Sequence, residues 1–112
     1  MDINHKNINT EGHKDIRIAN NYKDVLDDID AVSIVTPTKS HYKIANYFLA
    51  HKKHVLIEKP MTQTVLEAQK LIILAKKNKV ILQAGHLERF NPVMKKLSKD
   101  IKTPVFIEVH RL

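Results

Sequence analysis

The sequence contains no cysteine and no tryptophan, and only two of its 112 residues are glycines, Gly12 and Gly85. Without cysteine the chain has no disulfide framework and no thiolate metal site, and a reducing cytoplasm is its default location. No apolar run is long enough to span a bilayer, and the first residues lack the pattern of a secretory signal. We therefore expect neither a disulfide-stapled secreted protein nor a membrane protein.

Arginine is also scarce. The chain carries 19 basic and 12 acidic residues, a net charge of +7, but only Arg17, Arg89 and Arg111 are arginines. Recognition of base edges favours arginine. The lysines are scattered, with doublets such as Lys76-Lys77 near expected helix ends, where they complement the helix dipole. The charge therefore does not predict a specific nucleic-acid partner.

What the chain does have is a regular alternation of strand and helix patterns. Its apolar content of 43% and its length fit one globular domain. Short segments rich in β-branched and apolar residues, expected to be buried strands, are "AVSIVT" (31–36), "HVLIEK" (54–59) and "VILQAG" (80–85), with a brief further strand at 15–21 and a last one within 101–112. Helical periodicity lies between them at 21–30, 37–51, 64–79 and 92–97. Strands separated by helices predict an α/β fold with a parallel sheet whose strands are covered on both faces.

Helix boundaries are marked by capping residues. Thr64 and Glu67 form the pattern of a capping box, and Asn91 followed by Pro92 is typical of an N-cap with proline in the first turn. Asn21 and Ser40 are the expected N-caps of the other two helices. Each helix therefore has a polar start that fits the expected strand–helix order.

Three loops of unusual chemistry follow the strands, "TPTKSH", "EKPMT" and "GHLERFNP". The carboxyl ends of parallel strands share one edge of a sheet, so these loops should lie together where α/β proteins bind ligands. In the first loop Thr36, Ser40 and His41 offer hydrogen-bonding groups beside a helix N-terminus that suits an anion, although ordinary helix capping explains them as well.

The residues of the other two loops can also be explained either by function or by structure alone. Pro60 fixes the direction of Lys59, whose ammonium could exchange a proton with a substrate; taken alone, Glu58-Lys59 is more simply a surface pair on a turn. Gly85 permits close backbone approach. Arg89 could pair with a phosphate or with a carboxylate, Glu58 or Glu88, and the structural ion pair is favoured. The seven histidines show no metal-ligating spacing, so no metal is expected.

The segments "DAVSIVTPTKSHY", "KKHVLIEKPMTQT" and "QAGHLERFNP", in this order and spacing, resemble the glucose–fructose oxidoreductase / inositol dehydrogenase / MocA (Gfo/Idh/MocA) family over about residues 2–97. The segment "GHLERFNP" is similar to the corresponding segment of members that oxidise nucleotide-linked sugars. The resemblance implies a Rossmann domain, a doubly wound parallel sheet that binds NAD or NADP, followed by a larger domain that completes the substrate site.

The resemblance also implies roles for individual residues. Lys59 matches the catalytic lysine that contacts the reacting hydroxyl, and its bond to Pro60 is often cis in the family. Thr36, Pro37 and His41 would lie along the cofactor, Glu58 near the nicotinamide ribose, and Gln83 near the nicotinamide. Asp2 would hold the adenosine ribose diol, which favours NAD slightly, since a carboxylate repels a 2′-phosphate.

The chain departs from the family pattern at both ends. With only Gly12 and Gly85 it has no glycine-rich "GxGxxG" turn. We therefore expect residues 1–100 to form a partial NAD(P)-binding Rossmann domain lacking its first β-α unit, and 101–112 to form the first strand of a missing second domain. The missing first strand would leave open sheet edges, which suggests a homo-oligomer or a complementing chain.

Two functions remain open on this basis. One is a fragment of an NAD(P)-dependent oxidoreductase that moves hydride between the cofactor and a hydroxyl carbon of a sugar, cyclic polyol or sugar nucleotide. The other is a non-catalytic remnant or interaction module of the same fold. The enzyme family explains the motifs, whereas the second function explains the absent glycine turn.

Overall fold

The computed structural model describes residues 16–103, 105, 106 and 108, and a three-stranded parallel sheet organises them. Its strands are β1 (Ala31–Ile34), β2 (His54–Ile57) and β3 (Leu82–Ala84), in the spatial order β1-β2-β3. The register pairs Ile34 with Ile57 and Ile57 with Ala84, so the three strands end level with one another. This confirms the predicted α/β fold with a parallel, Rossmann-like sheet.

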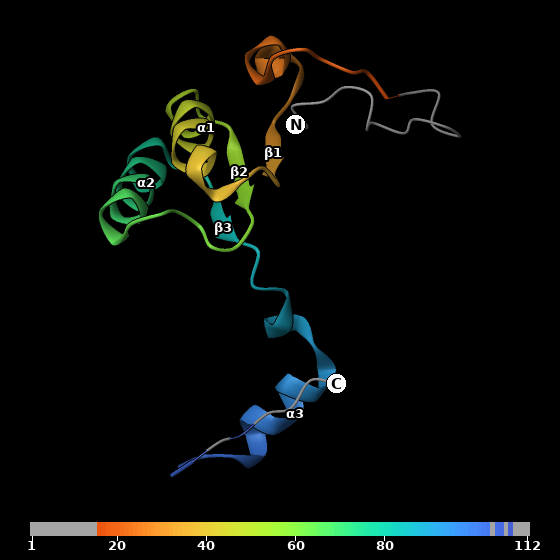
Figure 1. The fold of residues 1–112 in the computed structure, drawn as a ribbon, viewed down its shortest axis with the longest axis vertical. Coiled ribbons are helices and arrows are strands. Elements are labelled where there is room, and N and C mark those ends of the chain that lie inside the picture. Colours follow the sequence, from red (N-terminus) through yellow and green to blue (C-terminus); the bar gives the residue numbers. More distant parts are fainter. Residues whose placement is uncertain (1–15, 104, 107, 109–112) are drawn as a thin grey trace.

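Two helices cover one face of the sheet, α1 (Thr38–Ala50) and α2 (Val65–Asn78), and they lie side by side in Figure 1. The core between helices and sheet consists of Ile34, Ile44, Ala45, Phe48, Leu49, Val55, Ile57, Leu71 and Ala75. The 3-10 helix η2 (Tyr22–Asp28) packs against this core, where Tyr22 meets Tyr47 edge-on with ring centroids 5.5 Å apart. Burial of these side chains supplies the main stabilisation of the unit.

The opposite face of the sheet is open among the described residues. Ser33, Leu56 and Gln83 form one cross-strand row on that face, and all three side chains are exposed. The expectation that these strands are covered on both faces is therefore wrong for the part of the chain that the structure describes. Only Leu56 of this row is apolar, and α1 and α2 cover the other face, where Val55 and Ile57 are buried.

The predicted helix starts are largely confirmed. Thr64 accepts the amide of Glu67, whose carboxylate accepts the amide of Thr64, which completes the capping box of α2. Asn21 caps η2 and Asn91 caps α3 (Pro92–Asp100). Ser40 is not an N-cap, because α1 begins two residues earlier, after Pro37, and Ser40 donates its hydroxyl back to the carbonyl of Pro37.

The chain beyond β3 leaves the sheet, as the blue part of Figure 1 shows. The short 3-10 helix η3 (Leu87–Phe90) and α3 lie there. No strand is assigned to residues 16–21, where a brief one was expected, nor to the described residues of 101–112. The rest of 101–112 and the residue Asp2 lie outside the described residues, so the last strand and the two-part domain division stay predictions.

Candidate functional site

The three loops that follow the strands come together at one edge of the sheet. The amide of Glu58 donates to the carbonyl of Ile34 (3.0 Å), and the amide of Gly85 donates to the carbonyl of Ile57 (2.8 Å). These bonds extend the ladder one residue beyond the strands, from β1 to β2 and from β2 to β3. The groups that follow Ile34, Ile57 and Ala84 are therefore neighbours, as the sequence predicts.

His41 ties the first loop to the second. Its side chain is 1% exposed, with Nε2 2.6 Å from the carbonyl oxygen of Thr36 and Nδ1 3.0 Å from the carbonyl oxygen of Pro60. Whichever ring nitrogen carries a proton donates it to the carbonyl that it faces. The buried imidazole thus positions the chain on both sides of the site, and neither ring nitrogen is left for another partner.

Glu58 and Gly85 join the second loop to the third. A Cβ placed on Gly85 would stand 2.9 Å from Oε1 and 3.1 Å from Cδ of Glu58, which is closer than a real side chain approaches. The carboxylate therefore occupies the space that the glycine leaves, as the predicted close approach requires. Its other oxygen, Oε2, accepts the main-chain amide of Lys59 at 3.0 Å.

Lys59 stands at the rim of this edge with an exposed side chain, and the Lys59–Pro60 peptide is cis. Among the described residues no ion pair joins Lys59 to Glu58, so the simple surface pair is not formed. The ammonium is accessible to a ligand that lies over the edge of the sheet.

Three further predicted residues, Thr36, Pro37 and Gln83, lie at this edge or beside it. Thr36 and Pro37 lead from β1 into α1, and Thr36 Oγ1 lies 2.8 Å from Oγ of Ser40, within hydrogen-bond distance. Gln83 lies in β3 with its side chain exposed on the open face, opposite Leu56. Asp2 lies outside the described residues. The structure thus brings together Thr36, Pro37, His41, Glu58 and Lys59, with Gln83 at the adjoining open face.

Arg89 does not form the ion pair that was favoured for it. No described ion pair joins Arg89 to Glu58 or Glu88, and the carboxylate of Glu88 instead accepts the side-chain amide of Asn91 at 2.9 Å. The predicted ion pair of Arg89 is therefore wrong: the carboxylate of Glu88 is bonded to Asn91, and that of Glu58 lies against Gly85 and the amide of Lys59.

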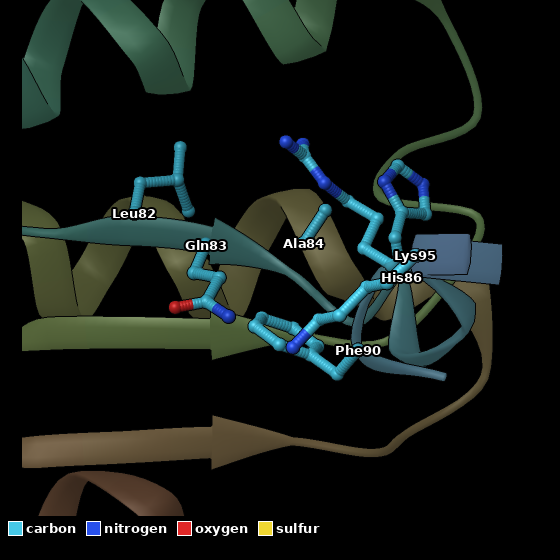
Figure 2. Close-up of a pocket in the computed structure, with 7 residues that line it drawn as sticks. Leu82, Gln83, Ala84, His86, Phe90 and Lys95 are labelled. Carbon is cyan, nitrogen blue, oxygen red and sulfur yellow. The ribbon is translucent and has the colours of Figure 1, made fainter. Parts of the chain in front are cut away.

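Arg89 lines a pocket of about 510 Å³ beside the carboxyl end of β3. Figure 2 shows this pocket, whose wall also includes Phe90 and Lys95. The sequence interpretation missed both residues; the signal was an aromatic ring in "ERFNP" followed by a lysine in the first turns of the next helix.

The described residues contain neither a metal site nor a membrane-spanning helix. No group of three His, Asp or Glu side chains there could hold a metal ion. No helix among them is long and apolar enough to cross a membrane.

Comparison with known proteins matches this region of the chain. A family model described as "Oxidoreductase family, NAD-binding Rossmann fold", that of Gfo/Idh/MocA, matches residues 4–86. The chain is similar to the UDP-N-acetylglucosamine 3-dehydrogenase of Acidithiobacillus ferrooxidans, with 38% identity over 89 residues, which are 79% of this chain and 28% of that protein. It is 39% identical over 75 residues to scyllo-inositol 2-dehydrogenase (NADP(+)) of Bacillus subtilis, covering 67% of this chain and 23% of that one.

A solved structure agrees with the sequence matches. That of the UDP-N-acetylglucosamine 3-dehydrogenase from Acidithiobacillus ferrooxidans superposes with a TM-score of 0.71 and 37% identity, covering 75% of this chain and 28% of the other. The chain therefore spans between a fifth and a third of the length of these relatives.

Proposed function

Because the chain belongs to the Gfo/Idh/MocA oxidoreductase family, whose domain here has an NAD-binding Rossmann fold, we propose that the loops at the carboxyl ends of β1, β2 and β3 form part of an NAD(P) site. The reaction would be oxidation of a CH–OH group, or its reversal. The observation that carries this proposal is the junction of the three loops through the contacts of His41 and of Glu58 with Gly85. α/β proteins bind ligands at such an edge.

The residues at this edge fit a nicotinamide cofactor in their chemistry. Thr36 and Pro37 lie at the N-terminus of α1, which favours a negatively charged group. Glu58 offers a carboxylate that can accept hydrogen bonds from ribose hydroxyls, and Gln83 offers an amide on the adjoining face. The bound cofactor would supply the hydride acceptor. His41 would act indirectly, by holding the two loops in place.

Lys59 would carry the proton transfer. With a bound cofactor to accept or supply the hydride, Nζ of Lys59 would take up the hydroxyl proton as the carbonyl forms, and in the reverse direction its ammonium would return that proton to the carbonyl oxygen. The accessible side chain and the main-chain anchor on Glu58 support this role. General acid–base groups of this kind contribute about 10²–10⁴-fold to rate.

The substrate class follows from the relatives, whose names include a sugar-nucleotide dehydrogenase and an inositol dehydrogenase. We infer a sugar, cyclic polyol or sugar-nucleotide substrate, processed in the cytoplasm. NAD is favoured over NADP on the strength of Asp2, whose carboxylate would accept the ribose diol and repel a 2′-phosphate.

The test is a dehydrogenase assay of the 112-residue chain with NAD⁺ or NADP⁺ and either scyllo-inositol or UDP-N-acetylglucosamine. Replacing Lys59 by Met should lower kcat by at least about 100-fold with little change in the KM of the cofactor. The matched control is Lys70→Met, an exposed lysine of α2. Equal activity of the two variants would overturn the role of Lys59.

A non-catalytic module of the same fold is the second candidate. It is favoured by the open face of the described sheet, where the exposed row of Ser33, Leu56 and Gln83 offers a surface to another chain. A folded chain that binds the cofactor but shows no turnover with any substrate, with or without Lys59, would establish this function instead.

A further inference from the structure

The helix α3 carries an apolar stripe that stays exposed among the described residues. Val93, Met94 and Leu97 lie in the helix and Ile101 directly follows it, at a spacing that places all four on one side. Their exposed fractions are 63%, 46%, 40% and 40%. Among the described elements α3 packs mainly against η3, and Figure 1 shows it apart from the sheet. An exposed stripe of this kind marks a surface that binds another apolar surface.

The open face of the sheet carries an apolar groove of about 310 Å³. Leu56 and Ile81 are its largest exposed apolar side chains, with exposed fractions of 40% and 62%. The other residues that line it are Ala31, Val32, Ser33, His54, Val55 and Gln83. The lining contains no Asp, Glu, Lys or Arg, so an apolar stripe laid into the groove would bury no unpaired charge.

The connection between β3 and α3 leads the helix away from the groove of its own chain. Within residues 85–91 the amide of Arg89 donates to the carbonyl of His86 (3.1 Å), and the amide of Asn91 donates to the carbonyl of Glu88 (3.1 Å). The side chain of Asn91 then caps α3. The connection is thus a bonded series of turns, and the stripe reaches the groove of its own chain only if these bonds break.

The surroundings of the stripe and of the groove carry opposite charges. Lys96 and Lys99 are exposed on α3. Asp24, Asp27 and Asp30 are exposed in η2 and directly before β1, the strand that borders the groove. Among the described residues no ion pair uses any of these five side chains. Opposite charges favour the encounter of a stripe with a groove, and like charges disfavour the encounter of two α3 helices.

We propose that α3 of one copy packs its apolar stripe into the open-face groove of a second copy, whose α3 returns the contact. Such an exchange forms a closed dimer with two-fold symmetry. One contact would bury on the order of 700 Å² over both partners, whereas two would bury about 1,400 Å², within the range of about 1,200–2,000 Å² for stable interfaces. Glu58 and Lys59 do not line the groove, so this surface is separate from the proposed reaction site and the inference goes beyond that function.

The experiment is sedimentation equilibrium of the 112-residue chain at about 100 μM, where the expected mass is twice that of one chain. Leu56→Glu in the groove and Leu97→Lys in the stripe should each weaken the dimer at least about tenfold, because each would bury a charge in an apolar contact. The matched control is Ile73→Glu, at a position of α2 that is 66% exposed and outside both surfaces. It should change the dissociation constant of the dimer less than about twofold.

Mixing the two variants tests the exchange itself. In a mixed dimer the unchanged α3 of the Leu56→Glu chain meets the unchanged groove of the Leu97→Lys chain, and the second contact brings opposite charges together. We therefore expect the mixture to form dimers although neither variant does so alone. A mixture that stays monomeric would overturn the exchange, as would a monomeric unchanged chain. A dimer that Leu97→Lys weakens and Leu56→Glu does not would be a contact between helices, and it would overturn the proposal too.

Discussion

At the scale of single residues, Gly85 is the position where one added methyl group would displace a side chain of the site. A methyl group there would lie 2.9 Å from Oε1 of Glu58, and the carboxylate is the far end of a flexible side chain that can swing away. The displaced carboxylate would leave the amide of Lys59 without its acceptor. Under the proposed function Gly85 would therefore be a positioning residue, acting on Lys59 through Glu58.

Gly85→Ala should therefore change the stability of the fold by less than about 1 kcal/mol but weaken NADH binding several-fold. Both quantities can be measured by thermal unfolding and by fluorescence titration. In the double variant Gly85→Ala, Glu58→Ser the shorter side chain removes the clash, so alanine should cost no further affinity than Glu58→Ser alone. Additive losses in the double variant would contradict the proposed route through Glu58.

The residue-level predictions from sequence succeeded where one local rule decides the outcome. "TVLE" specifies a capping box, "NP" a helix start, and a glycine after a strand a close approach, and all three are present. The partner of Arg89 could not be predicted, because the choice between Glu58, Glu88 and a ligand depends on how Asn91 and η3 fold.

At the scale of elements, the start of α1 is fixed by a contact distant in sequence. Its N-cap, Pro37, has no side-chain cap bond, whereas His41, in its first turns, reaches the carbonyl of Pro60, 19 residues away. Sequence patterns favoured Ser40 as the cap because serine is a common N-cap, but this rule ignores tertiary contacts. The histidine that joins α1 to the loop after β2 is the reason the helix and the loop keep their mutual position.

His41→Ala should accordingly destabilise the fold by about 2–4 kcal/mol, since it opens a cavity and removes the hydrogen bond that the imidazole donates to the carbonyl of Thr36 or of Pro60. His51→Ala is the matched control at the C-cap of the same helix: His51 is exposed, and its loss should cost less than about 1 kcal/mol. Urea unfolding of both variants measures the difference. Equal destabilisation by the two substitutions would show that His41 does not hold α1 to the loop after β2.

The faces of the elements were harder to predict than their existence. In α2 the apolar pattern includes Leu71 and Ala75, which are buried, but also Val65 and Ile72, which are 75% and 41% exposed. In β1 and β2 the apolar runs do not reveal which face carries the helices. Periodicity identifies apolar positions; contact with neighbouring elements determines which of them are covered.

At the scale of the whole molecule, the described residues form a sheet that helices cover on one face, and the loops after its strands meet at one edge. The family match covers residues 4–86, and the 89 residues that match the UDP-N-acetylglucosamine 3-dehydrogenase cover 28% of that protein. The sequence predicted the parallel sheet and the meeting of the loops because the carboxyl ends of parallel strands must coincide. The charged pocket could not be predicted, because it depends on where η3 and α3 lie after the chain leaves β3.

Calorimetric titration of the folded 112-residue chain with NADH measures whether the carboxyl ends of the three strands form a nicotinamide-cofactor site. We expect saturable one-to-one binding that Glu58→Gln weakens at least about tenfold, through loss of a charged hydrogen-bond acceptor. The control Asp24→Asn, in the first turn of η2, should leave the affinity unchanged. A folded chain that produces no binding heat at several temperatures, or that loses equal affinity in both variants, would contradict the claim.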